Sequence, residues 1–201
     1  MFGSRTRITL AGAGIAAALL VAGCGNDGSD GSANTSSAPM SGMNHGTSTA
    51  PRTDFNDADV SFLQMMYPHH AQAVDMAKLV PGRSQNQQLI TLAANVEKAQ
   101  APEMQQIADL LRRFGKPAPS ATMHHDMSGM MSQDQMTQLQ NSTGPDFDRM
   151  WMQMMIQHHQ GAIDMSNTEL ANGTNPDAKA LAQSIITAQQ AEIQQMQGML
   201  G

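Results

Sequence analysis

The chain contains one sequence pattern twice, and this repetition is its strongest constraint on folding. Residues 64–76 read QMMYPHHAQAVDM and residues 153–165 read QMMIQHHQGAIDM, so the copies lie 89 positions apart. The same offset relates two blocks farther along the chain: Ala99, Gln100 and Glu103 recur as Ala188, Gln189 and Glu192. A shared offset across separated blocks indicates a duplicated unit. Each unit carries paired thioether and imidazole groups, which are ligands for soft metal ions.

Composition supports a role for these groups beyond packing. The chain has 19 Met among 201 residues, while aromatic residues make up only 3 % of it. Met is flexible and fills gaps in apolar cores, so Met content alone would indicate a plastic core. A plastic core does not explain why six of the seven His occur as three His-His pairs, each near Met residues.

The N-terminus predicts a lipoprotein signal peptide over residues 1–23. Arg5 and Arg7 precede an apolar run that has the length of a signal-peptide core and is short for a membrane span. The sequence Val21-Ala22-Gly23-Cys24 resembles a bacterial lipobox, so Cys24 is expected to be the lipidated first residue of the mature protein. It is the only Cys, which excludes an internal disulfide and a thiolate ligand in the folded part.

The next segment, residues 24–53, is predicted to be a flexible Gly- and Ser-rich tether because it contains few large apolar side chains. Loss of Arg5 and Arg7 with the signal peptide changes the formal net charge from −6 to −8. This balance argues against nucleic acid as a partner and is compatible with attracting cations. The expected location is extracytoplasmic, in the periplasm or on the outer face of the cell membrane, with the lipid as anchor.

Residues 54–201 are predicted to form an all-α domain with four long helices. The expected ranges are about 57–79, 84–114, 145–171 and 176–201. Capping signals support the starts at Ser84 and at Asn175-Pro176, and a further one after Ser132 predicts a short additional helix.

The helices divide into two halves, 54–115 and 145–201, which are joined by a crossover at 116–144. Two similar helical hairpins with a long central crossover predict a ferritin-like four-helix bundle.

Helical spacing places each motif copy on the apolar stripe of its helix. The stripe residues of the motif are Met65, His69 and Met76 in the first copy and Met154, His158 and Met165 in the second. On the flank of the stripe lie two i, i+4 pairs, Met66 with His70 and Met155 with His159. His69 and His158 are therefore expected to face the interior of the bundle.

Polar residues interrupt the apolar faces of the two other long helices. These residues are Gln100, Glu103, Gln189 and Glu192. A buried carboxylate needs a partner or a metal, and the expected partners of the two Glu are His69 and His158. Two interpretations follow, a His–Glu pair that only fixes the core and a metal site. Two symmetric pairs beside Met doublets favour the metal site.

The crossover contains a third candidate site. Four Met and two His occur within nine residues: Met123, His124, His125, Met127, Met130 and Met131. Such a composition indicates metal binding, because Met in a flexible loop has no packing role.

The ligand types favour Cu(I) as the expected metal, because thioether and imidazole groups without thiolate suit it best. Zinc prefers Cys, His and carboxylate ligands. A ferritin-like di-iron site would need Glu-x-x-His, and no Glu lies three residues before any His.

With these motifs, the chain resembles the family catalogued as "domain of unknown function 305". The pattern of that family is a helical Met-(Ile/Met)-x-His-His-x-x-Ala-x-x-Met block, usually occurring twice, and residues 65–76 and 154–165 match it. Gln157 departs from the Pro that many members have. The resemblance covers about residues 54–200. It implies a ferritin-like helical bundle, a periplasmic or cell-surface location and, for some members, copper binding and copper resistance, without an established enzymatic activity.

The leading hypothesis is a membrane-tethered protein that sequesters or delivers Cu(I) through Met and His ligands and is not an enzyme. A copper-handling protein or a second copy of the chain would be its protein partner. One alternative is a metal-free helical interaction module whose His–Glu pairs only fix the core. Another is a redox enzyme that uses bound copper. For nucleophilic catalysis the sequence offers no G-x-S-x-G motif.

Overall fold

The computed structural model describes residues 54–201 except 118 and 122–126. The predicted signal peptide, Cys24 and the tether lie outside the described residues, as do Met123, His124 and His125 of the crossover tract.

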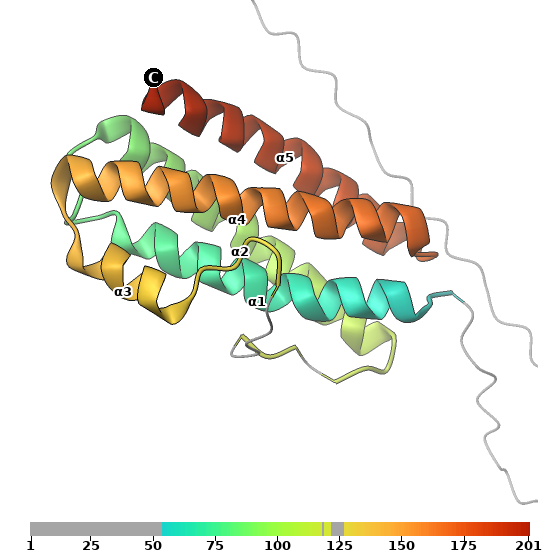
Figure 1. Cartoon of the computed structure of the whole chain (residues 1–201). Helices are drawn as coiled ribbons and strands as arrows, with labels where there is room; N and C mark the ends of the chain where they lie inside the picture. The colour runs from blue at the N-terminus through green and yellow to red at the C-terminus, as the bar shows by residue number, and fades with distance from the viewer. Residues whose placement is uncertain (1–53, 118, 122–126) are drawn as a thin grey trace, which may run out of the picture. The chain divides into compact units, whose positions relative to one another are not determined.

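Five α-helices and no strand make up the described part of the chain (Figure 1). Their bounds are α1 (Asp57–Leu79), α2 (Gln87–Arg113), α3 (Gln133–Asn141), α4 (Gly144–Asn172) and α5 (Pro176–Leu200). The predicted all-α class is confirmed, as is the pair of helical hairpins with a crossover between them. None of the helices in the described ranges is both long and apolar enough to cross a bilayer.

Side-chain caps explain where most helices begin. The Asn56 side chain accepts hydrogen bonds at the start of α1 and forms a capping box with Asp59, and Ser132 forms another box at α3. Asn175 caps α5 as predicted. The expected start of α2 at Ser84 was wrong by three residues. Asn86 is the cap instead, and the Ser84 hydroxyl accepts a hydrogen bond from the Asn86 backbone N–H.

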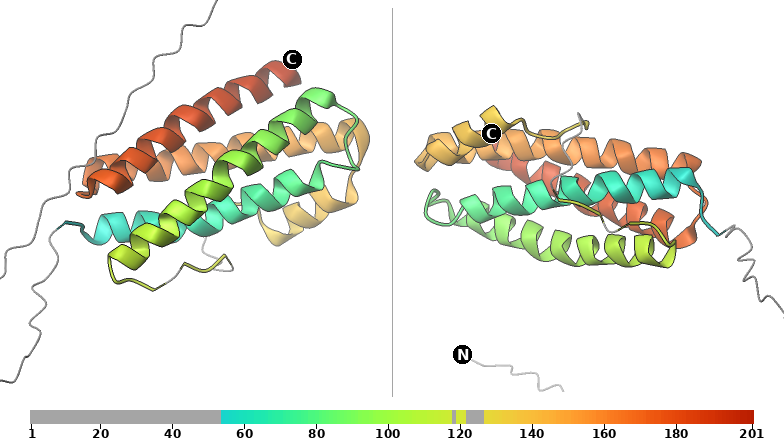
Figure 2. Two further views of the ribbon diagram at one scale, coloured as in Figure 1. Left: turned by 180° about the vertical axis from the view of Figure 1, so that it is seen from behind. Right: turned by 90° about the horizontal axis from the view of Figure 1, so that it is seen from below.

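The hairpins are α1–α2 and α4–α5, and packing of α1 against α4 joins them, while α2 and α5 make few contacts with each other (Figure 2). Helices α1 and α4 are antiparallel. The Asn56 side chain donates to the Asn172 carbonyl at 2.8 Å at one end, and the Trp151 indole donates to the Met76 carbonyl at 2.9 Å toward the other. The duplicated motifs therefore face each other across the middle of the bundle.

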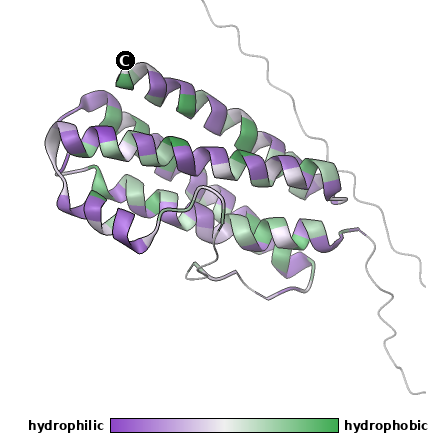
Figure 3. Cartoon of the chain, viewed as in Figure 1, coloured by the Kyte–Doolittle hydropathy of each residue, from purple (hydrophilic) through white to green (hydrophobic). Residues whose placement is uncertain are grey.

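The apolar core is divided into two clusters. One contains Met76, Leu92 and Trp151, and the other contains Leu63, Leu110 and Ile185. On each long helix, the residues of one cluster precede a central polar stretch and those of the other follow it. Figure 3 shows hydrophilic residues interspersed with hydrophobic ones along every helix. The polar stretches of the four long helices thus lie between the two clusters.

Candidate metal centre

A belt of polar side chains separates the two apolar clusters. Each long helix contributes two residues, and we refer to the eight together as the polar belt: His69 and His70, Gln100 and Glu103, His158 and His159, Gln189 and Glu192. The four His are fully buried, and the two Gln are nearly so. Burial of this many polar groups is costly unless they are used, so the belt is the principal candidate site.

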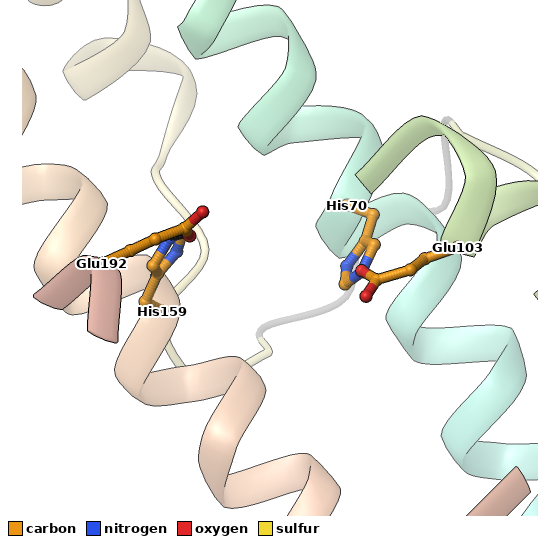
Figure 4. A network of polar contacts seen from close by, with 4 residues as sticks. All are labelled: His70, Glu103, His159 and Glu192. Carbon is orange, nitrogen blue, oxygen red and sulfur yellow. Dashed lines mark hydrogen bonds and ion pairs between the residues drawn. The ribbon is translucent and has the colours of Figure 1, made fainter. Parts of the chain in front are cut away.

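Two imidazole–carboxylate hydrogen bonds connect the helices within each hairpin. His70 Nε2 lies 2.7 Å from Glu103 Oε2, and His159 Nε2 lies 2.6 Å from Glu192 Oε2 (Figure 4). The predicted pairing of these Glu with His69 and His158 was therefore wrong by one residue. A helix in contact with two neighbours buries more than one narrow stripe. The flank positions of α1 and α4 consequently face α2 and α5, while the stripe positions face each other.

The remaining two imidazoles meet where the hairpins join. The ring centroids of His69 and His158 are 3.8 Å apart, with 42° between the ring planes. Burial and the neighbouring His70 lower the pKa of His69 to about 3. Burial and the nearby His69 lower the pKa of His158 well below its usual value. Both rings are therefore neutral at physiological pH, which is the form of imidazole that binds metals.

Hydrogen bonds on Nε2 leave Nδ1 unused in three of the four rings. His70 and His159 donate from Nε2–H to their Glu carboxylates, and His69 donates to the Ser128 carbonyl at 3.3 Å. In a neutral ring with a proton on Nε2, the lone pair lies on Nδ1. None of these Nδ1 atoms has a hydrogen-bond partner, and neither nitrogen of His158 has one in the described structure. Carboxylates and carbonyls that orient imidazoles in this way commonly support metal ligands.

The Met residues of the motif differ from the prediction in their placement. Met66 and Met155, expected on the flank, are fully buried, whereas Met65 and Met154 on the expected stripe are half-buried. The reason is the same as for the His residues: α1 and α4 each contact two other helices, so their flank positions are buried as well. Because α1 and α4 are antiparallel, Met66 lies on one side of the polar belt and Met155 on the other. Thioether groups therefore approach the belt from both apolar clusters.

The end of the crossover is fastened over the belt by α1 and α4. The Gln72 amide donates to the Met131 carbonyl at 2.8 Å and accepts from the Met131 N–H at 2.7 Å. At the position of α4 equivalent to Gln72, Gly161 lets Ser128 and Gly129 approach so closely that a Cβ atom on Gly161 would overlap the Ser128 carbonyl. Gln72 of α1 and the equivalent Gly161 of α4 therefore both hold the same segment of the crossover, one by hydrogen bonds and the other by close packing.

This arrangement changes the interpretation of the crossover tract. Met131, expected in a flexible loop as a metal ligand, is buried in an apolar cluster, where packing accounts for it. Met127 and Met130 are half-buried. Between them, Ser128 reaches the polar belt, because its carbonyl oxygen accepts a hydrogen bond from His69.

The types of ligand in the belt restrict which metal ions the site can hold. Among the described residues, no three His, Asp or Glu side chains converge on one point. These residues therefore do not form a closed structural zinc site, which is built from such groups alone. Buried imidazole nitrogens with adjacent thioethers instead match the donor preference of a soft ion that accepts few ligands.

A carboxyl pair that the sequence did not indicate lies at the end of the bundle where α1 begins and α4 ends. Asp59 accepts hydrogen bonds from the Thr174 and Asn175 backbone N–H groups and so holds the loop that leads into α5. Burial and contact with the Asp59 carboxylate raise the pKa of Glu169 to about 8. Burial would raise the pKa of Asp59, but the hydrogen bonds that it accepts lower it instead. The pair therefore shares a proton, which resides on Glu169.

Comparisons with known proteins decide the relationship. Residues 59–200 match the profile of the family described as Domain of unknown function (DUF305). The chain belongs to the DUF305 family. A search of curated proteins finds no significant match.

Solved structures of DUF305 proteins share the fold. A DUF305 fragment from Deinococcus radiodurans is 34 % identical, with a TM-score of 0.66 over 73 % of this chain and 97 % of that one. A secreted-protein candidate of the family from Streptomyces coelicolor is 28 % identical, with a TM-score of 0.66 over 71 % and 91 %. CopM in a Cu(I)-bound form is 31 % identical, with a TM-score of 0.60 over 70 % and 94 %. CopM has also been solved in Cu(II)-bound and Ag-bound forms.

Proposed function

We propose that this DUF305 protein binds copper as Cu(I), and equally its analogue Ag(I), in the polar belt. The observation that carries the proposal is the set of four fully buried imidazoles with unpartnered ring nitrogens. His70 and His159 would present Nδ1 while Glu103 and Glu192 hold their rings, and Met66 and Met155 would add thioether sulfur. Copper- and silver-bound forms of the similar protein CopM support this choice of metal.

The protein would store or hand over the ion and would not catalyse a reaction. The imidazoles of His69 and His158 are neutral, and apolar clusters enclose the site, so a monovalent ion would meet little competition from strongly hydrated divalent ions. We further propose an extracytoplasmic location with Cys24 as a lipid anchor, which the lipobox-like sequence and the secreted-protein candidate among the similar structures support. The transfer partner would be a copper-handling protein or a second copy of the chain.

Equilibrium dialysis under reducing conditions tests the metal. The purified protein should retain Cu(I) and Ag(I) and little Zn(II). The double variant His69→Phe/His158→Phe should retain less Cu(I), because it lacks the ring nitrogens of these two His but keeps two aromatic rings there. Absence of retained Cu(I) in the unaltered protein would refute the proposal and leave the metal-free interaction module as the better interpretation.

The anchor is tested separately. Cys24→Ala should move the protein from the membrane pellet to the soluble or secreted fraction. Unchanged membrane association of this variant, without a lipid adduct by mass spectrometry, would exclude the lipoprotein assignment.

A further inference from the structure

A small cavity between α1 and α4 lies apart from the polar belt, in the end of the bundle that holds Asp59. Its volume is about 120 Å³, and residues from both helices line it, among them Ala58, Ser61, Phe62, Met65, Met165 and Glu169. The two motif copies contribute different members here. Met65 is the first Met of the doublet in one copy, and Met165 is the last residue of the other copy. The antiparallel packing of α1 and α4 brings these two thioethers to one cavity.

The internal duplication provides a comparison with the other end of the same protein. The positions equivalent to Met65 and Met165 are Met154 and Met76, so both Met are present at both ends. The other lining positions differ in size and polarity. The equivalents of Ala58, Ser61, Phe62 and Glu169 are Phe147, Met150, Trp151 and Val80.

The equivalent residues at the other end belong to the apolar core. Phe147, Trp151 and Val80 are all fully buried in one apolar cluster, and Met150 packs against it. The Met pair at that end is therefore explained by packing. At the cavity end Ala58, Ser61 and Phe62 stand in place of Phe147, Met150 and Trp151, yet both Met are kept and a carboxyl group is added. Packing does not account for that combination.

Glu169 is the least expected of the lining residues. Its side chain is 1 % exposed, and in the described structure neither carboxyl oxygen receives a hydrogen bond from an N–H donor. On one side it abuts Asp59, whose oxygens are already used by the backbone of Thr174 and Asn175. On the other side it borders the cavity with the two Met. A buried carboxyl group of this kind is costly, which points to a function at the cavity.

We propose that Met65, Met165 and Glu169 form a second site for a soft monovalent cation, distinct from the polar belt. Two thioethers supply the soft donors that select Cu(I) or Ag(I). Binding of the ion would release the proton that Glu169 holds, so that the resulting carboxylate balances the single positive charge within an apolar surrounding. Only the choice of ion rests on the proposed function. The location rests on the cavity, on the buried carboxyl group and on the difference between the two ends.

Silver titration of the full protein with isotopically labelled Met methyl groups tests the proposal. Ag(I) should shift the methyl resonances of Met65 and Met165, which the single variants Met65→Leu and Met165→Leu would assign. The double variant Met65→Leu/Met165→Leu should lose one silver equivalent. Leu conserves the side-chain volume, so folding should be retained. Glu169→Gln should weaken this site while leaving both Met residues in place.

Two matched variants separate this site from the belt and from general Met loss. The variant Met76→Leu/Met154→Leu changes the matching pair at the other end of the bundle. It should bind as much silver at the cavity as the unaltered protein and should keep the shifts of the Met65 and Met165 methyl groups. His69→Phe/His158→Phe should reduce binding at the belt but also leave those shifts intact. Full silver stoichiometry in Met65→Leu/Met165→Leu, together with a loss in the His variant, would overturn the cavity site and leave the proposed function standing. Silver bound at the cavity with none bound at the belt would refute the proposed function and leave the cavity site standing.

Discussion

The rings of His69 and His158 contact each other at the centre of the bundle, with centroids 3.8 Å apart, although they come from opposite halves of the duplication. Their sequence neighbours His70 and His159 turn away from this contact and bond to Glu103 and Glu192. Adjacent residues of one motif therefore have different roles. The first His of each pair joins the two hairpins, and the second joins the helices within a hairpin.

This division predicts opposite effects for neighbouring substitutions on the metal-free protein. His158→Phe keeps an aromatic ring and removes two buried nitrogens that have no partner, so the free energy of unfolding should be unchanged or higher. His159→Phe keeps a ring too but leaves Glu192, whose side chain is 16 % exposed, without its partner. We expect that variant to lose about 1–3 kcal/mol. Urea denaturation of both variants measures the difference, and equal losses would contradict the assigned roles.

Asp59 and Asp148 occupy equivalent positions of the duplication but should differ in importance. Asp59 accepts hydrogen bonds from Thr174 and Asn175 and helps to begin α5, whereas Asp148 Oδ1 is buried without a partner. Asp59→Asn should lower the free energy of unfolding by about 1–3 kcal/mol, because it weakens charge-assisted hydrogen bonds. Asp148→Asn serves as the matched control and should change it little. Thermal denaturation of the two variants measures this difference, and equal losses of stability would contradict the different roles of Asp59 and Asp148.

The protonated Glu169 predicts a pH dependence of stability. Its pKa is about 8 in the folded protein against an ordinary value of 4.5, so the folded protein holds the proton more tightly than the unfolded chain. The stability from this proton is complete below about pH 4.5 and is lost as the pH rises toward 8. Glu169→Gln cannot titrate, so its stability should fall less across this range than that of the unaltered protein.

Denaturant midpoints between about pH 5 and pH 9 would measure this effect. The exposed carboxylate of Asp164 offers a control, because Asp164→Asn should keep the pH dependence of the unaltered protein. Parallel pH profiles for Glu169→Gln and the unaltered protein would show that Glu169 does not carry the proton.

The sequence predicted the fold well because local signals and the duplication agreed. The caps at Asn175 and Ser132 define helix starts without reference to the rest of the chain, and the repeated motif implies a second hairpin like the first. It also predicted that His69 and His158 face inward, which the structure confirms.

The partners within the site were not predictable in the same way. A single helix pattern shows one apolar stripe, but α1 and α4 each contact two other helices, and only the packing shows that His70 and His159 reach the Glu residues. The Asp59–Glu169 pair joins residues far apart in sequence. The one available signal was Glu169 itself, an acidic residue at a position where the first copy has Val80.

The last prediction concerns the contact that holds the crossover over the belt, which a single added methyl group should disrupt. Gly161 is buried in α4, and a Cβ atom there would overlap the Ser128 carbonyl oxygen. Gly161→Ala should therefore displace residues 127–131, break the hydrogen bond from His69 to Ser128 and destabilise the protein by about 1–3 kcal/mol. Gly198→Ala is the control, because a Cβ atom there meets nothing within 4 Å and Ala favours a helix over Gly by about 1 kcal/mol. Amide hydrogen exchange should show faster exchange of the Met131 N–H in Gly161→Ala and not in Gly198→Ala. If exchange at Met131 is the same in both variants, the Gln72 hydrogen bonds alone hold the crossover and the contact at Gly161 does not.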